Sequence, residues 1–139
     1  MKVDSIKNGV VIDHITPGKG MEIYRFLGLD SLNCPIAIIM GAASRRMGQK
    51  DIIKVDTDIP LVLDALGYID PDVTVNIIEE GLLTKKYHPG LPEEIVDIVK
   101  CKNPRCITTT EQELSHVFRL TDKETRTYRC IYCESKAKE

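Results

Sequence analysis

Four cysteines in the last third of the chain have the spacing of a metal site. They form two pairs, Cys101-x4-Cys106 and Cys130-x2-Cys133, which are separated by 23 residues. Each short spacing lets one turn present two sulfur atoms, and two such turns can surround one tetrahedral ion. Four thiolates leave no position for water, so the pattern predicts one structural Zn²⁺ per chain rather than a catalytic metal.

Two disulfide bonds, or unrelated thiols, are the alternatives to a metal. The chain has five cysteines, an odd number, and its first residues, MKVDSIKNG, carry no apolar signal segment. These features favour a cytoplasmic location, where thiols stay reduced and paired cysteines bind metals. The fifth cysteine, Cys34, precedes Pro35 and an apolar run, and we interpret it as a buried or half-buried free thiol.

A second candidate site begins with the pair Asp13-His14, at the end of the apolar run GVVIDHI. Neighbouring residues on a strand point to opposite faces, so Asp13 cannot orient His14 as the acid of a catalytic triad orients its base. Walker, G-x-G-x-x-G and H-E-x-x-H patterns are absent from the sequence, as is a recognisable nucleophile elbow. The sequence therefore predicts binding without catalysis.

Lysines on the expected strands suit a phosphorylated ligand. Lys50 and Lys54 are four residues apart and share a strand face, and Lys86 lies on a later strand. Together with Asn76 and Asp13 they could hold a nucleotide, the lysines binding phosphates and the carboxylate accepting from ribose hydroxyls. Ordinary solvated lysines are the commoner explanation of this pattern. A net charge of -2 supplies no general attraction to nucleic acid or to an anionic membrane.

The order of expected elements indicates an α+β fold. Strands are predicted at 9–15, 35–40, 52–55, 73–78 and 82–87, with helices at 21–27 and from Asp58 to Gly67, and a polar loop at 41–51. This β-α-β-β-α-β order with an extra hairpin strand predicts a ferredoxin-like antiparallel sheet that carries both helices on one face. Val73, Val75 and Ile77 would face the helices, which leaves Thr74 and Asn76 on the open face.

The segment HPGLP at 88–92 reads as a linker, because two prolines and a glycine disfavour regular structure. We place a ligand-binding domain at 1–93 and a small all-β, zinc-ribbon-like domain at 94–139. The second is near the size at which a domain needs a metal to stay folded. No apolar run is long enough for a membrane span.

Five ordered signatures give the chain a resemblance to a known family. They are VIDHI at 11–15, MG-x-KD-x-IK at 47–54, TVN-x-I at 74–78, LPE-x-I at 91–95 and the cysteine pattern at 101–133. In these the chain resembles the regulatory chain of aspartate carbamoyltransferase over nearly its whole length. The resemblance implies a non-catalytic subunit that binds ATP as activator and CTP, with UTP in some members, as inhibitor of the first committed step of pyrimidine biosynthesis.

The resemblance also implies partners and site residues. The first domains would pair as regulatory dimers, and the zinc domains would dock on catalytic chains and link two catalytic trimers. Lys86 and His14 would bind phosphates, Asp13 the ribose, and Lys54 the base or ribose. The full implied nucleotide site is Val3, Asp4, Ile6, Asp13, His14, Lys50, Lys54, Asn76 and Lys86.

Two points stay open at the level of sequence. A regular strand would send Asp13 and His14 to opposite faces, although the resemblance places both in the site. Gly81 stands where the family often has a bulkier residue beside the base, which leaves base selectivity undecided. A free-standing zinc-ribbon protein that binds nucleic acid is the alternative function, but residues 107–128 mix charges of both signs and offer little aromatic surface for stacking.

Overall fold

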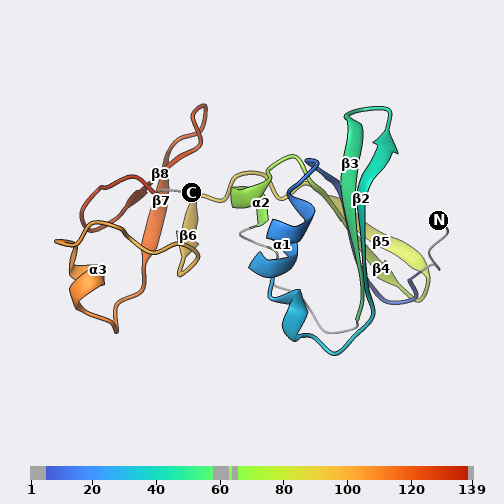
Figure 1. Ribbon diagram of the computed structural model, residues 1–139, viewed down its shortest axis with the longest axis horizontal. Helices are drawn as coiled ribbons and strands as arrows, with labels where there is room; N and C mark the ends of the chain where they lie inside the picture. The colour runs from blue at the N-terminus through green and yellow to red at the C-terminus, as the bar shows by residue number, and fades with distance from the viewer. Residues whose placement is uncertain (1–5, 58–62, 64–65, 138–139) are drawn as a thin grey trace. The chain divides into compact units, whose positions relative to one another are not determined.

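The computed structural model describes residues 6–57, 63 and 66–137 (Figure 1). The chain divides into two compact units, Met1–Gly90 and Leu91–Glu139. The division falls within the segment HPGLP. Among the described residues, no helix has both the length and the apolar character needed to cross a membrane.

The first unit is built on a five-stranded antiparallel sheet with strand order β2-β3-β1-β4-β5. The strands are β1 (Gly9–Ile15), β2 (Ile36–Ser44), β3 (Gly48–Asp56), β4 (Thr74–Glu79) and β5 (Leu82–Tyr87). The helical segments are α1 (Gly20–Phe26), the 3-10 turn η1 (Leu29–Ser31) and α2 (Leu66–Ile69). The predicted α+β class and antiparallel sheet are therefore confirmed.

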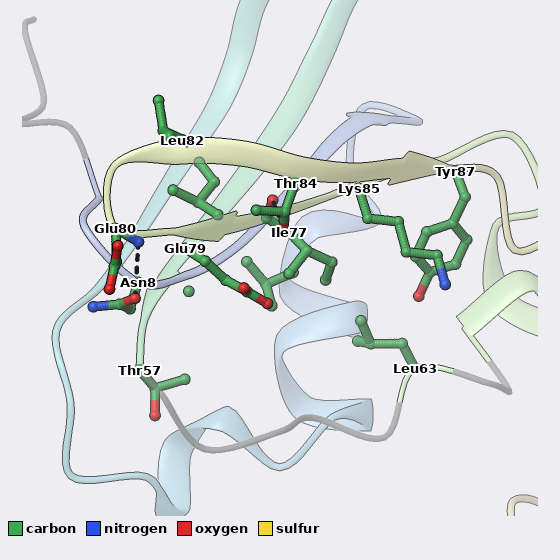
Figure 2. A pocket seen from close by; sticks show the side chains of 13 residues that line it. Asn8, Thr57, Leu63, Ile77, Glu79, Glu80, Leu82, Thr84, Lys85 and Tyr87 are labelled. Atoms are coloured by element: carbon green, nitrogen blue, oxygen red, sulfur yellow. Dashed lines mark hydrogen bonds between the residues drawn. The ribbon is translucent and has the colours of Figure 1, made fainter.

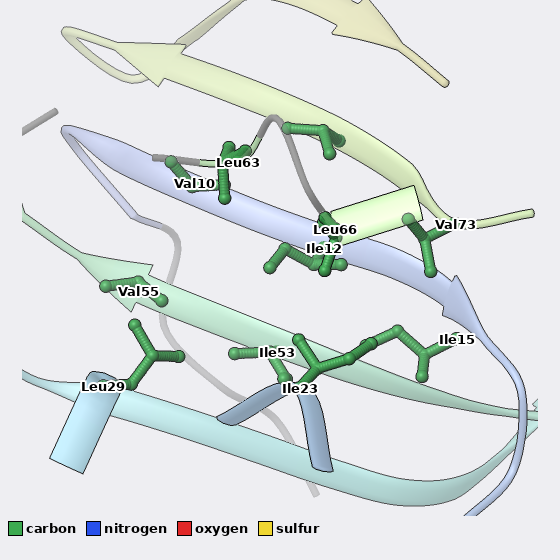
Figure 3. Close-up of a cluster of buried hydrophobic side chains, with 11 residues drawn as sticks. Val10, Ile12, Ile15, Ile23, Leu29, Ile53, Val55, Leu63, Leu66 and Val73 are labelled. Carbon is green, nitrogen blue, oxygen red and sulfur yellow. The ribbon is translucent and has the colours of Figure 1, made fainter. Parts of the chain in front are cut away.

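One face of this sheet carries the core. Fully buried side chains of β1, β3 and β4 meet Ile23 of α1, Leu29 of η1 and Leu66 of α2 in one cluster (Figure 3). Val73 and Val75 belong to the cluster and Ile77 packs against it, as the alternation in β4 predicts. The opposite face of the sheet is consequently the one on which Asn76 lies.

The hairpin of β2 and β3 is longer than the sequence suggested. The predicted loop at 41–51 is wrong, because β2 continues to Ser44, β3 begins at Gly48, and the turn is confined to 45–47. A bulge between Ile39 and Ala42 contains Gly41, with φ +72°, whose N–H donates to Asp51 Oδ1 at 3.0 Å. The ladder satisfies the backbone, Arg45, Arg46 and Gln49 remain exposed, and the buried Asp51 carboxylate accepts from backbone N–H groups, so the polar composition of 41–51 did not indicate a loop.

The helices of the first unit agree in part with those predicted from the sequence. Gly28 has φ +65° and ends α1, with its N–H donating to Arg25 O, as a left-handed C-cap predicts. Most of the helix expected from Asp58 lies outside the described residues. The prediction that Gly67 ends this helix is wrong, since Gly67 lies within α2. A Cβ there would come within 1.5 Å of the Gly90 carbonyl oxygen, so glycine allows α2 to approach the end of the first unit.

The second unit contains a three-stranded antiparallel sheet, β6 (Glu94–Val96), β7 (Val117–Asp122) and β8 (Thr127–Cys130), in the order β6-β7-β8. Ile95, Phe118 and Tyr128 are buried in it. The expectation of an all-β module missed one helical turn, α3 (Ile107–Thr110), which follows Cys106 directly. Thr109 forms this turn by donating its hydroxyl to the Cys106 carbonyl at 2.7 Å.

Candidate functional site

The four paired cysteines come together in the second unit. Their Sγ atoms all lie within 4.8 Å of one another; Cys101 and Cys133 are 3.5 Å apart, and Cys106 and Cys130 are 3.7 Å apart. Four sulfurs at 2.3 Å from a tetrahedral zinc ion would be about 3.8 Å apart, whereas a disulfide requires about 2.05 Å. All four are free thiols. The geometry therefore fits a metal ion, and two disulfides are ruled out for this arrangement.

Backbone turns present the sulfurs. The Cys106 N–H donates to Asn103 O at 3.0 Å and closes the first turn, and the Glu134 N–H donates to Cys130 O at 2.9 Å and closes the second. The Cys101 N–H donates to His116 Nδ1 at 3.0 Å, which holds the start of the first turn against the N-terminal end of β7. Each pair of ligands is thus presented by a turn that local hydrogen bonds close.

The electrostatics of the thiols also suit a cation. Burial raises the pKa of Cys101 to about 12 and also raises that of Cys130. Burial would raise the pKa of Cys133 as well, but hydrogen bonds involving Ser135 outweigh it and bring this pKa to about 6. The clustered sulfurs, with the thiolate form favoured at Cys133, are a donor set that a divalent ion such as Zn²⁺ would complete. The metal ligands predicted from spacing are therefore together in the structure.

The open face of the first unit's sheet brings several predicted binding residues into one row. Lys54 on β3 pairs with Val11 on β1, Val11 pairs with Asn76 on β4, and Asn76 pairs with Lys86 on β5. Directly opposed residues on antiparallel strands share a face, so Lys54, Asn76 and Lys86 point the same way. Asn76 Nδ2 donates to Val11 O at 3.2 Å, which fixes the amide within the row.

Asp13 lies beside this row and holds a lysine. The Lys50 Nζ atom is 2.9 Å from Asp13 Oδ1 and 3.2 Å from Oδ2. Burial alone would raise the Asp13 pKa, but the hydrogen bond from Lys50, the hydrogen bond from the His14 N–H and the nearby positive charges outweigh burial and leave it below 3.8. Asp13 is accordingly an ionised acceptor at neutral pH.

A bulge in β1 places His14 on the same face as Asp13. The β1–β3 register shifts between Ile12 and Ile15, and His14 takes the left-handed conformation with φ +58°. The His14 Nδ1 atom lies 3.0 Å from Thr74 Oγ1, on the residue that pairs with Asp13. The strict alternation expected for a regular strand therefore fails at this point, and the conflict between the two neighbours disappears.

The surroundings of His14 favour its neutral form. Burial lowers its pKa below 6.5, Asp13 acts in the opposite direction, and the charges of Lys50, Arg46 and Lys86 lower it further. Three cations therefore act on one imidazole. The two-residue periodicity had placed Thr74 on the open face with Asn76, without a role in the site, and sequence reasoning missed Arg46.

Three predicted nucleotide-binding residues belong to the N-terminal segment. Val3 and Asp4 lie outside the described residues, and Ile6 is a buried side chain. Gly81 occupies the β4–β5 turn with φ +78°, and its N–H donates to Lys7 O at 2.8 Å. The turn thus ties the N-terminal segment to the edge of the sheet.

A hollow of about 780 Å³ lies elsewhere, over the residues drawn in Figure 2. Its lining includes Val10 and Ile77, whose side chains belong to the core-bearing face, and Thr57 and Leu63, which flank the undescribed residues 58–62. The row of Lys54, Asn76 and Lys86 contributes nothing to this lining. The hollow is therefore separate from the row of predicted binding residues.

Comparison with known proteins covers both units. Residues 1–89 match the family described as aspartate carbamoyltransferase regulatory chain, allosteric domain, and residues 93–139 match the metal binding domain of the same chain. The aspartate carbamoyltransferase regulatory chain of Clostridium acetobutylicum is 46% identical over 134 residues, which cover 96% of this chain and 92% of the relative. That of Bifidobacterium longum is 41% identical over 138 residues, 99% of both chains. With both domains matched in order and relatives of this identity aligned along nearly their full length, the chain belongs to the aspartate carbamoyltransferase regulatory chain family.

Proposed function

We propose that the chain is the non-catalytic subunit through which nucleotides control aspartate carbamoyltransferase, and thereby pyrimidine biosynthesis. The observation that carries this proposal is the convergence of Asp13, His14 and the row residues on the open face of the sheet in a chain of this family. A fully solvated set of lysines would not require an ionised acceptor and an imidazole at the same place. The ligands would be ATP and CTP, with UTP as in some members of the family.

In the proposed site, cations and acceptors take different parts of the nucleotide. Lys86 and His14 bind phosphates, and Asp13 accepts hydrogen bonds from ribose hydroxyls. Lys54, at the β3 position of the row, contacts the base or ribose, and Asn76 stands between the two lysines. Residues Val3, Asp4 and Ile6 of the N-terminal segment would complete the site beside the base.

The first unit supports this role through its topology. Its order β2-β3-β1-β4, with helical segments between β1 and β2 and between β3 and β4, is that of a ferredoxin-like fold, to which β5 adds an edge strand. Such a sheet covers one face with helices and leaves the other for a ligand. We further propose that this unit pairs with a second copy to form a regulatory dimer.

The second unit is the proposed attachment to the catalytic chain. A zinc ion held by the four cysteines would supply no chemistry and would fix the two turns that carry exposed apolar side chains. Ile107 follows Cys106, and Ile131 and Tyr132 lie between Cys130 and Cys133; their exposed fractions are 49%, 41% and 47%. Apolar side chains held outward by a rigid turn suit a protein partner better than water. Retained thiols are consistent with the cytoplasm.

The alternative, a free-standing zinc-ribbon protein that binds nucleic acid, rested on the cysteines alone. The family match over residues 1–89 involves the first unit as well, which favours the regulatory role. Salt-dependent retention of the full chain on DNA or RNA would support the alternative.

Reconstitution tests the proposal. The full chain, purified with zinc, is mixed with its cognate catalytic trimer, and the species are separated by size with light-scattering detection. We expect a larger complex whose activity responds to ATP and CTP. Failure to form any larger species with zinc present would contradict attachment, and an assembled enzyme that ignores every nucleotide would contradict sensing.

A further inference from the structure

Fewer cations are available to bind phosphates in the structure than the sequence suggests. Lys50 is already paired with Asp13, through contacts of 2.9 and 3.2 Å, so much of its charge is compensated. Lys54 lies opposite Val11, two residues before Asp13 in β1. His14 favours its neutral form. The neighbourhood of His14 therefore relies mainly on Lys86, although a nucleoside triphosphate carries several negative charges.

The β2–β3 hairpin supplies another cation at this place. Ala42 pairs with Lys50 and Ser44 with Gly48, which leaves residues 45–47 as the turn, and the Met47 N–H donates to Ser44 Oγ at 3.2 Å. Figure 1 shows β2 and β3 running past the neighbouring strands, so the turn lies beyond the end of the β1–β3 ladder at Ile15 and Asp51.

Within this hairpin, Arg46 is the central residue of the turn. Along β3 the odd-numbered Asp51, Ile53 and Val55 are buried, so even-numbered positions such as Lys50 look toward the row. Arg46 is exposed in the turn, which follows the end of the β1–β3 ladder beside which His14 lies. Its charge acts on the His14 imidazole together with those of Lys50 and Lys86, which is consistent with this placement.

We propose that Arg46 is a phosphate-binding residue of the nucleotide site, reaching from the tip of the β2–β3 hairpin to the phosphates held at His14 and Lys86. This rests on the proposed function, since it names a further ligand contact of the same site. A guanidinium is always charged and can bind two phosphate oxygens with parallel N–H groups, which a lysine cannot do. As an exposed side chain on a two-stranded extension, Arg46 can close over a bound triphosphate without disturbing the core.

The adjacent Arg45 provides a matched control. It has the same charge, is also exposed and lies in the same turn, but the charges that act on the His14 imidazole are those of Lys50, Arg46 and Lys86. Binding of CTP and of cytidine to the full-length chain with its metal is measured by calorimetry for the wild type, Arg46→Ala, Arg45→Ala and Arg46→Lys. Cytidine carries no phosphate and so reports on the base and ribose contacts alone.

We expect Arg46→Ala to weaken CTP binding by about 5- to 30-fold, the range of a charge-assisted contact at a partly exposed site, and to leave cytidine binding unchanged. Arg45→Ala should change CTP binding by less than about twofold, and Arg46→Lys should restore part of the loss. The difference between Arg46→Ala and the wild type should shrink in high salt.

Equal effects of the two alanine substitutions would overturn the proposal, because they would indicate a non-specific electrostatic attraction by the positive charge of the hairpin. An unchanged CTP affinity in Arg46→Ala would overturn it too. A loss of cytidine binding in Arg46→Ala would reassign the residue to the nucleoside or to folding. If the wild type binds neither CTP nor ATP, the proposed function itself fails, a result distinct from failure of this residue alone.

Discussion

Replacing Cys130 with alanine is expected to unfold the second unit while the first remains folded. Cys130 is the last residue of β8, is 1% exposed and pairs with Phe118 on the central strand β7. Its loss removes one of four metal ligands and leaves the sulfurs of Cys101, Cys106 and Cys133 clustered without a complete site. The substitution therefore tests whether the metal or the apolar core holds this unit together.

The structure allows the stabilisation from the apolar core of the second unit to be compared with that from the metal site. Apart from cysteines, the buried apolar side chains described in the second unit are Ile95, Phe118 and Tyr128. Full burial of such a side chain contributes about 1.5–3 kcal/mol, so three contribute at most about 9 kcal/mol before the entropy of ordering the unit is subtracted. A structural zinc site contributes about 10–16 kcal/mol of apparent binding free energy at neutral pH. The metal term exceeds the core term, so losing a ligand should cost the unit its fold.

Amide hydrogen exchange on the full chain provides the assay, with bound metal measured by a chromophoric chelator. In Cys130→Ala the amides of β7 and β8 should exchange at the rate of an unfolded chain, while those of β1 and β4 keep their protection. Cys34→Ala is the matched control, because Cys34 lies in the first unit and should leave both metal content and exchange unchanged. Native protection of β7 in a metal-free chain would refute the reasoning.

Three further changes probe the first unit. Lys86→Ala should weaken ATP and CTP by similar factors of about 5 to 30 in calorimetry if Lys86 binds phosphates, and an effect on one base alone would reassign it. The pKa of His14 lies below 6.5 because of burial and, after it, nearby cations. Bound phosphates favour the imidazolium, so the affinity for CTP should rise as the pH falls from 8 toward 6. The variant His14→Asn should retain only the part of this rise that comes from the nucleotide's own titration. Gly67→Ala would place a Cβ 1.5 Å from the Gly90 carbonyl oxygen, so we expect a destabilisation of the first unit of about 1–3 kcal/mol, seen as a lower thermal midpoint. A midpoint equal to that of the wild type would show that the two backbones separate freely.

Local patterns predicted the parts of the fold that depend on neighbours in sequence. The Val and Ile run from Gly9 to Ile15 became β1 with those bounds, because its alternation matches a sheet with one buried face. Gly28 ended α1, since only the residue after the helix needs the left-handed conformation. The cysteine pairs identified the metal ligands for the same reason, as each pair lies in one turn.

The parts that failed depend on the partner strands. A bulge at His14 arises from how β1 pairs with β3, which a single strand does not reveal. The polar segment after Met40 became strand because β2 and β3 satisfy each other's backbone groups along an exposed hairpin. Gly67 seemed to end a helix, but its purpose is the close approach of Gly90, a contact between residues far apart in sequence. The sequence therefore named candidate residues, and the pairing of the strands supplies the geometry that brings Asp13, His14 and Lys50 together.

The same contacts bear on how a signal could leave the first unit. Nucleotides affect a distant partner only if they bind its two states unequally, and typical couplings are about 1–3 kcal/mol. On the first unit's side, His88 Nδ1 lies 3.1 Å from Val73 O and Gly90 packs on Gly67, so the segment is anchored up to Gly90. Within the second unit, the Tyr128 hydroxyl donates to the Pro92 carbonyl, which anchors the segment from the other end. Each unit therefore holds its own end of the segment HPGLP, the first unit through His88 and Gly90 and the second through Pro92.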